Sequence, residues 1–230
     1  MTNLIAAVGF FIAIHLLISG TRVRGLAIAR FGQGPYMGGF VVLSWVGLIW
    51  IIWAFVRART DPGNHVYWGV QETTRHVQLA IQLVAMALIV LGLSTRNPTA
   101  VRSESAVERP DVVRGALRIT RHPFLWGVVV WAAGHLLVNG DLASFVLFGG
   151  MLALALFGTR SIDAKRRAAL GPAWDAFAGQ TSNVPFAAIA SGRQQLRLGE
   201  IGLWRFVLAL AVWAALAFAH PYLFGVRALP

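Results

Sequence analysis

Cysteine is absent from the 230 residues of this chain. Its absence excludes disulfides, iron–sulfur clusters, thiolate haem ligands and cysteine nucleophiles. Acidic residues are also scarce, since nine aspartates and glutamates stand against 20 lysines and arginines. None of the nine lies in the long apolar runs of the chain. This scarcity disfavours a carboxylate-rich metal site inside a membrane.

Charge of either sign is rare, because 13% of the residues are charged whereas 57% are hydrophobic. Such a chain is too apolar for an ordinary soluble domain of this size. A membrane-crossing helix needs about 20 apolar residues. Six runs approach that length: 3–19, 37–56, 76–93, 123–139, 142–158 and 206–224. The sequence therefore predicts an all-α, polytopic membrane helix bundle of about six transmembrane helices, in a single domain over residues 1–230.

The segments between these runs are asymmetric in charge. Segments 20–36, 94–122 and 159–205 hold 16 of the 20 lysines and arginines. Basic loops face the cytoplasm, so both termini are predicted outside, in a multi-pass protein of the cell inner membrane. No zinc-finger or RNP pattern supports binding of nucleic acid. Membrane lipid is the expected partner of the basic loops instead.

Two short features interrupt the predicted helices. Only Gly140 and Asp141 separate the fourth and fifth runs, which predicts a tight antiparallel hairpin. Residues 160–179 have a helical period that extends the fifth run, and they are expected to break at Gly171–Pro172. Beyond this break, we expect the segment to lie along the membrane surface.

Histidines are the main candidates for chemistry: His15, His65, His76, His122, His135 and His220. His15 and His135 lie inside apolar runs, where an ionisable side chain is costly and usually has a functional partner. His65 lies in a polar loop and is expected to be solvated, while the other three lie at or near the ends of runs. Two buried imidazoles on facing helices, without cysteine or acids, suit haem iron. The alternative is a neutral imidazole bonded to a backbone carbonyl or a serine.

Four stretches, which together span nearly the whole chain, resemble the NnrU family: FFIAIHLLISGTRVR (10–24), GALRITRHPFLWGVVVWAAGHLLVNGD (115–141), TSNVPFAAIASGR (181–193) and AHPYLFG (219–225). More distantly, the chain resembles plant and cyanobacterial ζ-carotene isomerase. The resemblance implies haem b held by His15 and His135. It also implies either a role in nitrite and nitric oxide metabolism (denitrification), with nitric oxide reductase components as partners, or redox-gated cis–trans isomerisation of an apolar, carotenoid-like polyene.

Depth in the membrane argues against a simple pairing of these two histidines. At 1.5 Å per residue, His15 lies about 18 Å from the outer start of its helix, whereas His135 lies about 6 Å from the outer end of its own. His76 matches the depth of His135 better. The pair of His15 and His135 is therefore the first choice, and His135 with His76 is the rival. His122 and His135 lie about 20 Å apart along one helix and cannot share an iron.

A second resemblance involves RHPFLWG (121–127) and AALGPAWDAFAGQTSNVP (168–185). These stretches are similar to membrane methyltransferases that bind S-adenosylmethionine on the cytoplasmic side. Leu125 stands where those enzymes carry a tyrosine, and their paired glutamates are missing here. We expect Arg121 and His122 to position a haem propionate or a cofactor phosphate. The alternative is that Arg121 binds lipid phosphate and His122 caps loop backbone.

Two functions of other classes therefore stay open beside the haem protein. One is an S-adenosylmethionine-dependent membrane methyltransferase. The other is a non-catalytic assembly or regulatory protein for nitric oxide reductase. No catalytic residue is assigned from the sequence. If the protein is an enzyme, an isomerase is the first expectation and a methyltransferase the second.

Overall fold

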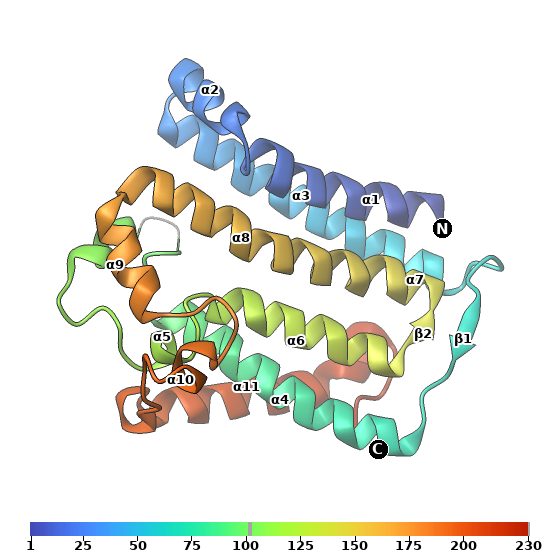
Figure 1. Ribbon diagram of the computed structural model, residues 1–230. Helices are drawn as coiled ribbons and strands as arrows, with labels where there is room; N and C mark the ends of the chain where they lie inside the picture. Colours follow the sequence, from blue (N-terminus) through green and yellow to red (C-terminus); the bar gives the residue numbers. More distant parts are fainter. Residues whose placement is uncertain (101–102, 230) are drawn as a thin grey trace. The chain divides into compact units, whose positions relative to one another are not determined.

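The computed structural model describes residues 1–100 and 103–229 and is almost entirely helical (Figure 1). The α-helices are α1 (Thr2–Ala13), α2 (Arg22–Phe31), α3 (Gln33–Arg59), α4 (Glu72–Ser94), α5 (Ala116–Ile119), α6 (Pro123–Val138), α7 (Leu142–Ser144), α8 (Gly150–Leu170), α9 (Pro172–Gln180), α10 (Ala187–Ala190) and α11 (Leu203–Phe224). Two π-helical turns are η1 (Ile14–Ile18) and η3 (Phe145–Gly149), and two 3₁₀ turns are η2 (Glu104–Glu108) and η4 (Leu198–Glu200). The strands are β1 (Val66–Trp68) and β2 (Gly140–Asp141).

Contacts divide the chain into two compact units. The first unit consists of Met1–Gln71 with His135–Leu154, and the second consists of Glu72–Gly134 with Ala155–Pro230. Each unit takes part of α6 and part of α8. The single domain expected over residues 1–230 stays a prediction.

Among the described residues, four helical segments are long and apolar enough to cross a membrane: Gln33–Arg59, Glu72–Ser94, Leu142–Leu170 and Leu203–Phe224. Thr2–Ile18 and Arg22–Phe31 pass the same test only as a pair, and they bend by 78° at their break. The 16 residues of α6 extend roughly 24 Å, which is less than a hydrocarbon core of ~30 Å. The all-α polytopic bundle is confirmed, and the described residues contain four or five candidate spans by length and composition, where the sequence predicted about six.

In the first unit, α1 packs lengthwise on α3 (Figure 1). The core between them and the start of α7 consists of Leu4, Ala7, Val8, Ile51, Ala54, Ala58 and Ala143. Alanines at such a contact let two membrane helices approach closely. Trp45, Ile49 and Trp53 of α3 are exposed, so this helix also presents a large apolar surface of the kind that lipid covers.

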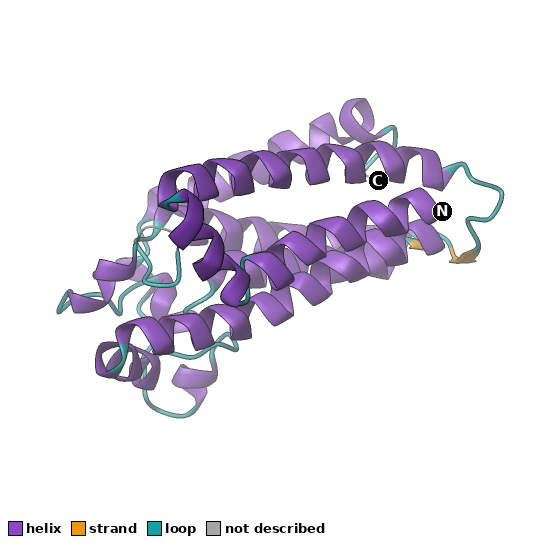
Figure 2. Ribbon diagram, turned by 90° about the horizontal axis from the view of Figure 1, so that it is seen from above, coloured by secondary structure: helices purple, strands orange, loops and turns teal. Residues whose placement is uncertain are grey.

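Three segments that the sequence predicted to lie outside the cell meet at one end of the first unit: the N-terminus, the segment before α4 and the turn after α6. The Met1 ammonium lies 2.8 Å from Asp61 Oδ2, and the Leu142 amide donates to the His65 carbonyl at 2.9 Å. Strands β1 and β2 pair antiparallel here, at the same end as the N-terminus (Figure 2). The expected turn at Gly140 and Asp141 is present, and the two residues also form β2, which the sequence did not predict.

In the second unit, α4 packs against α11 and α6. Trp213 Nε1 of α11 donates to the Leu79 carbonyl at 3.0 Å. A Cβ atom added at Gly127 of α6 would lie 2.6 Å from Ile89 Cγ1, and one added at Gly134 would lie 2.4 Å from Gln78 Oε1. The absence of a side chain at both glycines therefore permits the close approach of α6 to α4.

The predicted break at Gly171–Pro172 is confirmed. Helix α8 ends at Leu170, Gly171 adopts φ +52°, and Pro172 occupies the first turn of α9, where a missing N–H costs nothing. The expectation that the following segment lies along the membrane surface stays a prediction. Its apolar side chains Trp174 and Phe177 are buried against Leu117, so they are not available to lipid.

Candidate functional site

Residues 118–123 and 181–186 belong to two different motif stretches, and they dock on each other through backbone contacts. The Arg121 amide donates to the Ser182 carbonyl at 2.9 Å, and the Phe186 amide donates to the Ile119 carbonyl at 2.8 Å. Thr120 Oγ1 donates to the Asn183 carbonyl at 2.6 Å. The second unit therefore joins segments that lie about sixty residues apart in the sequence.

The carboxylate of Asp163 is the centre of this junction. Arg121 donates from Nε to both carboxylate oxygens at 3.0 Å and from Nη2 to Oδ2 at 2.6 Å. His122 Nε2 lies 2.7 Å from Asp163 Oδ1, and Asn183 Nδ2 donates to Oδ2 at 3.4 Å. The His122 side chain is 1% exposed and that of Asp163 is 18% exposed. This is a largely buried charge cluster, in which each polar group depends on the others.

The sequence had assigned no role to Asp163, although it is the single acidic residue of α8. The helix carries it past the predicted end of the fifth apolar run at residue 158, to the level of the 118–123 segment. A lone carboxylate among basic residues of a helical extension is a signal that could have indicated an ion pair. Its partners could not be chosen by spacing, since they lie 41 and 42 residues earlier.

The neighbouring side chains of Arg121 and His122 both bind Asp163. The Arg121 guanidinium also lies 6.0 Å from the centroid of the Trp174 ring. These contacts lie within the protein itself. The expectation that the two residues hold a haem propionate or a cofactor phosphate stays a prediction.

His15 lies in the π-helical turn η1 of the first unit. Its Nδ1 is 2.8 Å from the Phe11 carbonyl oxygen, and its ring lies 4.3 Å from the Phe11 ring and 5.1 Å from the Phe40 ring. A histidine that donates one ring N–H to a carbonyl keeps the other nitrogen for a metal. Single π-helical turns are frequent at functional sites. His15 thus has one ring nitrogen at the Phe11 carbonyl and its ring between two phenylalanines.

His135 also belongs to the first unit. Its ring stacks on Phe148, with centroids 4.5 Å apart and planes inclined by 18°. Phe148 belongs to the other π-helical turn, η3, and its ring lies 5.9 Å from that of Phe55. Both His15 and His135 are thus linked to π-helical turns and to aromatic rings.

The structure does not bring His15 and His135 to one level. His15 lies beside Phe40 of α3, whereas His135 reaches Phe55 of the same helix through Phe148. Phe40 and Phe55 are separated by about 22 Å along α3 at 1.5 Å per residue. Two imidazole nitrogens on one iron are about 4 Å apart, which is twice a metal–nitrogen bond of about 2 Å. A single haem held by both histidines therefore does not fit this arrangement.

The remaining histidines have local partners. His76 Nδ1 lies 3.0 Å from the Glu72 carbonyl in the second unit, and His220 Nδ1 lies 2.8 Å from the Val226 carbonyl. His65 stacks edge-on with Tyr67. The rival pair of His135 and His76 joins residues of different units and stays a prediction. Among the residues that the structure describes, no group of three or more histidines and acids could hold a metal ion.

Comparison with known proteins decides the family. The family model described as NnrU protein matches residues 3–228. This chain belongs to the NnrU family. The membership predicted from the sequence motifs is confirmed.

Two curated relatives of this NnrU protein are chloroplastic 15-cis-zeta-carotene isomerases. The one from Zea mays is 31% identical over 189 residues, which cover 81% of this chain and 50% of the relative. The one from Arabidopsis thaliana is 32% identical over 127 residues, which cover 53% of this chain and 35% of the relative. The chain thus spans half or less of the length of these relatives. No solved structure matches it, and the similarity to methyltransferases stays a prediction.

Proposed function

We propose that this NnrU protein is a membrane isomerase that acts on a cis double bond of a long, apolar, carotenoid-like polyene. The observation that carries the proposal is the similarity to 15-cis-zeta-carotene isomerase over 81% of this chain. Apolar helices of membrane-spanning length are consistent with a substrate that dissolves in the bilayer.

A shallow groove beside His15 is the place where we propose that the polyene binds. The groove has a volume of about 210 Å³ and is lined by Phe11, Phe40, Val41, Ser44, Trp45 and Leu48. Phe11 and Phe40 also contact the His15 ring. An apolar chain in this groove would gain from burial against aromatic rings and would reach the imidazole from the lipid side.

Haem b is part of this proposal, with His15 and His135 as separate candidates for ligation. Bound haem would supply an iron centre whose ligation changes with its oxidation state. The contact of His15 Nδ1 with the Phe11 carbonyl would fix the ring plane and leave Nε2 for the iron. Stacking on Phe148 would restrict the ring of His135 in the same way.

Visible spectra of the detergent-purified protein, oxidised and dithionite-reduced, test the haem. We expect b-type bands that are lost or shifted in His15→Ala or in His135→Ala. They should persist in His65→Ala, the control in an outer loop. A colourless wild type from haem-sufficient cells would remove the haem. Binding of S-adenosylmethionine by wild type and Arg121→Ala would then be the next measurement.

Conversion of a 15-cis polyene, followed by chromatography of its geometric isomers in the dark, tests the isomerase itself. Membranes containing the wild type should convert the substrate. Membranes with His15→Phe, which fills the aromatic pocket without an imidazole, should not. An unchanged substrate in membranes where the wild type is folded would contradict the proposal.

We propose a second candidate function from the denitrification role that the resemblance to the NnrU family implies. Here the protein acts in nitrite and nitric oxide metabolism of a cell inner membrane, with nitric oxide reductase components as partners. A strain that lacks the protein should then grow poorly on nitrite without oxygen. Rescue by a variant without His15 and His135 would favour a non-catalytic assembly role, since assembly does not need the imidazoles.

A further inference from the structure

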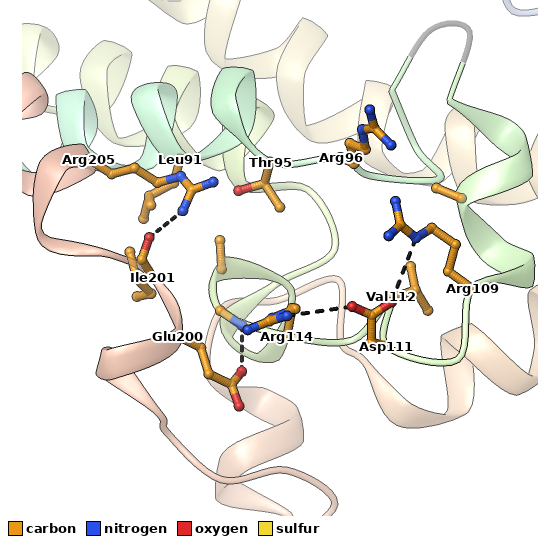
Figure 3. Close-up of a pocket in the computed structure, with 13 residues that line it drawn as sticks. Leu91, Thr95, Arg96, Arg109, Asp111, Val112, Arg114, Glu200, Ile201 and Arg205 are labelled. Carbon is orange, nitrogen blue, oxygen red and sulfur yellow. Dashed lines mark hydrogen bonds and ion pairs between the residues drawn. The ribbon is translucent and has the colours of Figure 1, made fainter.

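A pocket in the second unit is rich in arginine and is not used by the proposed function. It has a volume of about 320 Å³ and is lined by Leu91, Thr95, Arg96, Ala106, Arg109, Asp111, Val112, Arg114, Gly115, Ala116, Glu200, Ile201 and Arg205. Figure 3 shows Arg96 and Arg109 on one side of this pocket and Arg205 on the other. Four guanidinium groups thus line one space of the size of a small polar headgroup.

The two acids of the pocket are already paired. Asp111 lies 3.6 Å from Arg109 and 3.5 Å from Arg114. Glu200 accepts from Arg118 Nε and from the Gly115 amide, both at 2.8 Å. Arg118 is not a lining residue, so it supplies the positive charge that balances Glu200 from outside the pocket.

Because Asp111 is shared by two arginines and Glu200 is balanced by Arg118, the pocket carries more positive than negative charge. Arg205 donates to the hydroxyl and to the carbonyl of Ser94, at 3.0 and 3.2 Å, and both acceptors are neutral. Within the described part of the chain, no carboxylate lies in an ion pair with Arg96 or Arg205. A cavity that gathers net positive charge attracts anions, and the planar arginine fork matches the oxygens of a phosphate.

The position of the pocket indicates where such an anion comes from. Leu91 and Thr95 lie at the end of α4, and Arg205 lies in the first turn of α11, and both helices are candidate membrane spans. Leu91, Ala116 and Ile201 form one buried apolar cluster in its wall. The pocket thus combines an apolar wall with arginines at the ends of two candidate spans. Such a site suits an amphiphilic molecule better than a fully hydrated ion.

We propose that this pocket binds a phosphate group, and its place at the ends of two spans favours the headgroup of an anionic phospholipid. Arg96 and Arg205 are the residues that bind the phosphate oxygens. Arg109 and Arg114 add to the positive potential around them. The proposal does not depend on the isomerase or on haem.

Thermal unfolding of the purified protein in a neutral detergent tests the site, with phosphatidylglycerol, phosphatidylcholine and inorganic phosphate as separate probes. Phosphatidylglycerol should raise the midpoint, because a ligand that binds only the folded state stabilises it. The affinity for it should fall about tenfold in Arg96→Ala, as loss of one charge-assisted contact predicts. Arg96→Lys should retain part of the affinity.

The matched control is Arg160→Ala, which removes another exposed arginine of the second unit and should bind as the wild type does. Protection by inorganic phosphate as strong as that by phosphatidylglycerol would support the phosphate site and assign it to a soluble source. Equal protection by phosphatidylcholine and phosphatidylglycerol would overturn the proposal. Equal affinities of wild type and Arg96→Ala would overturn it too.

Discussion

Asp163 forms hydrogen bonds with two side chains that have few other partners. Arg121 and His122 both depend on this carboxylate, and His122 is almost fully buried. Removing one member of such a cluster leaves buried polar groups without a counter-charge, which costs more than the cluster itself contributes. The junction of segments 118–123 and 181–186 therefore depends on a single carboxylate of α8.

Replacing Asp163 with alanine should destabilise the protein by about 3 kcal/mol. For a chain of this length, that corresponds to a fall in the unfolding midpoint of roughly 6–12 °C. Asp175→Ala is the matched control, because Asp175 and Arg167 form an ion pair with side chains 59% and 65% exposed. The control should change stability by less than about 1 kcal/mol. Equal effects of both variants would show that Asp163 has no special structural role.

Glu200 predicts a dependence of stability on acid. The hydrogen bond from Arg118, followed by that from the Gly115 amide, lowers the pKa of the Glu200 carboxyl from 4.5 to about 2. A carboxyl with a lowered pKa stabilises the fold above its ordinary pKa, and this contribution disappears as the pH falls from 4.5 toward 2. Unfolding midpoints measured over this range should converge for wild type and Glu200→Gln at the acid end. A difference in unfolding midpoint between wild type and Glu200→Gln that stays constant with pH would contradict the lowered pKa of Glu200.

At the scale of elements, the contact between α4 and α6 depends on glycine. A Cβ atom at Gly127 would also lie 2.9 Å from the Ile89 amide nitrogen and 3.0 Å from the Ala85 carbonyl oxygen. These are backbone atoms of α4, so they cannot move aside without shifting the helix. The close packing of two apolar helices here is therefore specified by the absence of a side chain.

Gly127→Ala should accordingly cost about 1–3 kcal/mol, because overpacking forces α4 and α6 apart. The control is Gly38→Ala in α3, where a Cβ atom would meet nothing within 4 Å. Gly38→Ala should leave stability unchanged or raise it by up to about 1 kcal/mol through helix propensity. Thermal unfolding in detergent measures both, and a stable Gly127→Ala would refute the close contact.

At the scale of the whole molecule, the orientation in the membrane rests on loop charge. The absence of cysteine makes it measurable, because a single introduced thiol is then the only one in the protein. A membrane-impermeant maleimide should label Gly69→Cys, in the segment before α4, from the outside of intact cells. Gln195→Cys, before α11, should react only after the membrane is opened. The reverse pattern would invert the predicted topology.

Hydropathy and local residue preferences were sufficient to predict that the chain is helical. The apolar runs became helices, and the break at Gly171–Pro172 occurred where a glycine with φ +52° precedes proline. These features depend on residues a few positions apart, which is the range over which helix periodicity and turn preferences act. The motif stretches were likewise sufficient to identify the family, and the family model matches residues 3–228.

Tertiary structure decided which distant residues meet. The association of Asp163 with Arg121 and His122, the different levels of His15 and His135 along α3, and the arginine pocket at the ends of α4 and α11 all depend on how helices pack. The burial of Trp174 against Leu117 likewise depends on which element covers α9, which the helical pattern of this segment did not specify. The sequence could not supply these contacts, because a helical period specifies which face is apolar and leaves open the neighbour that covers it.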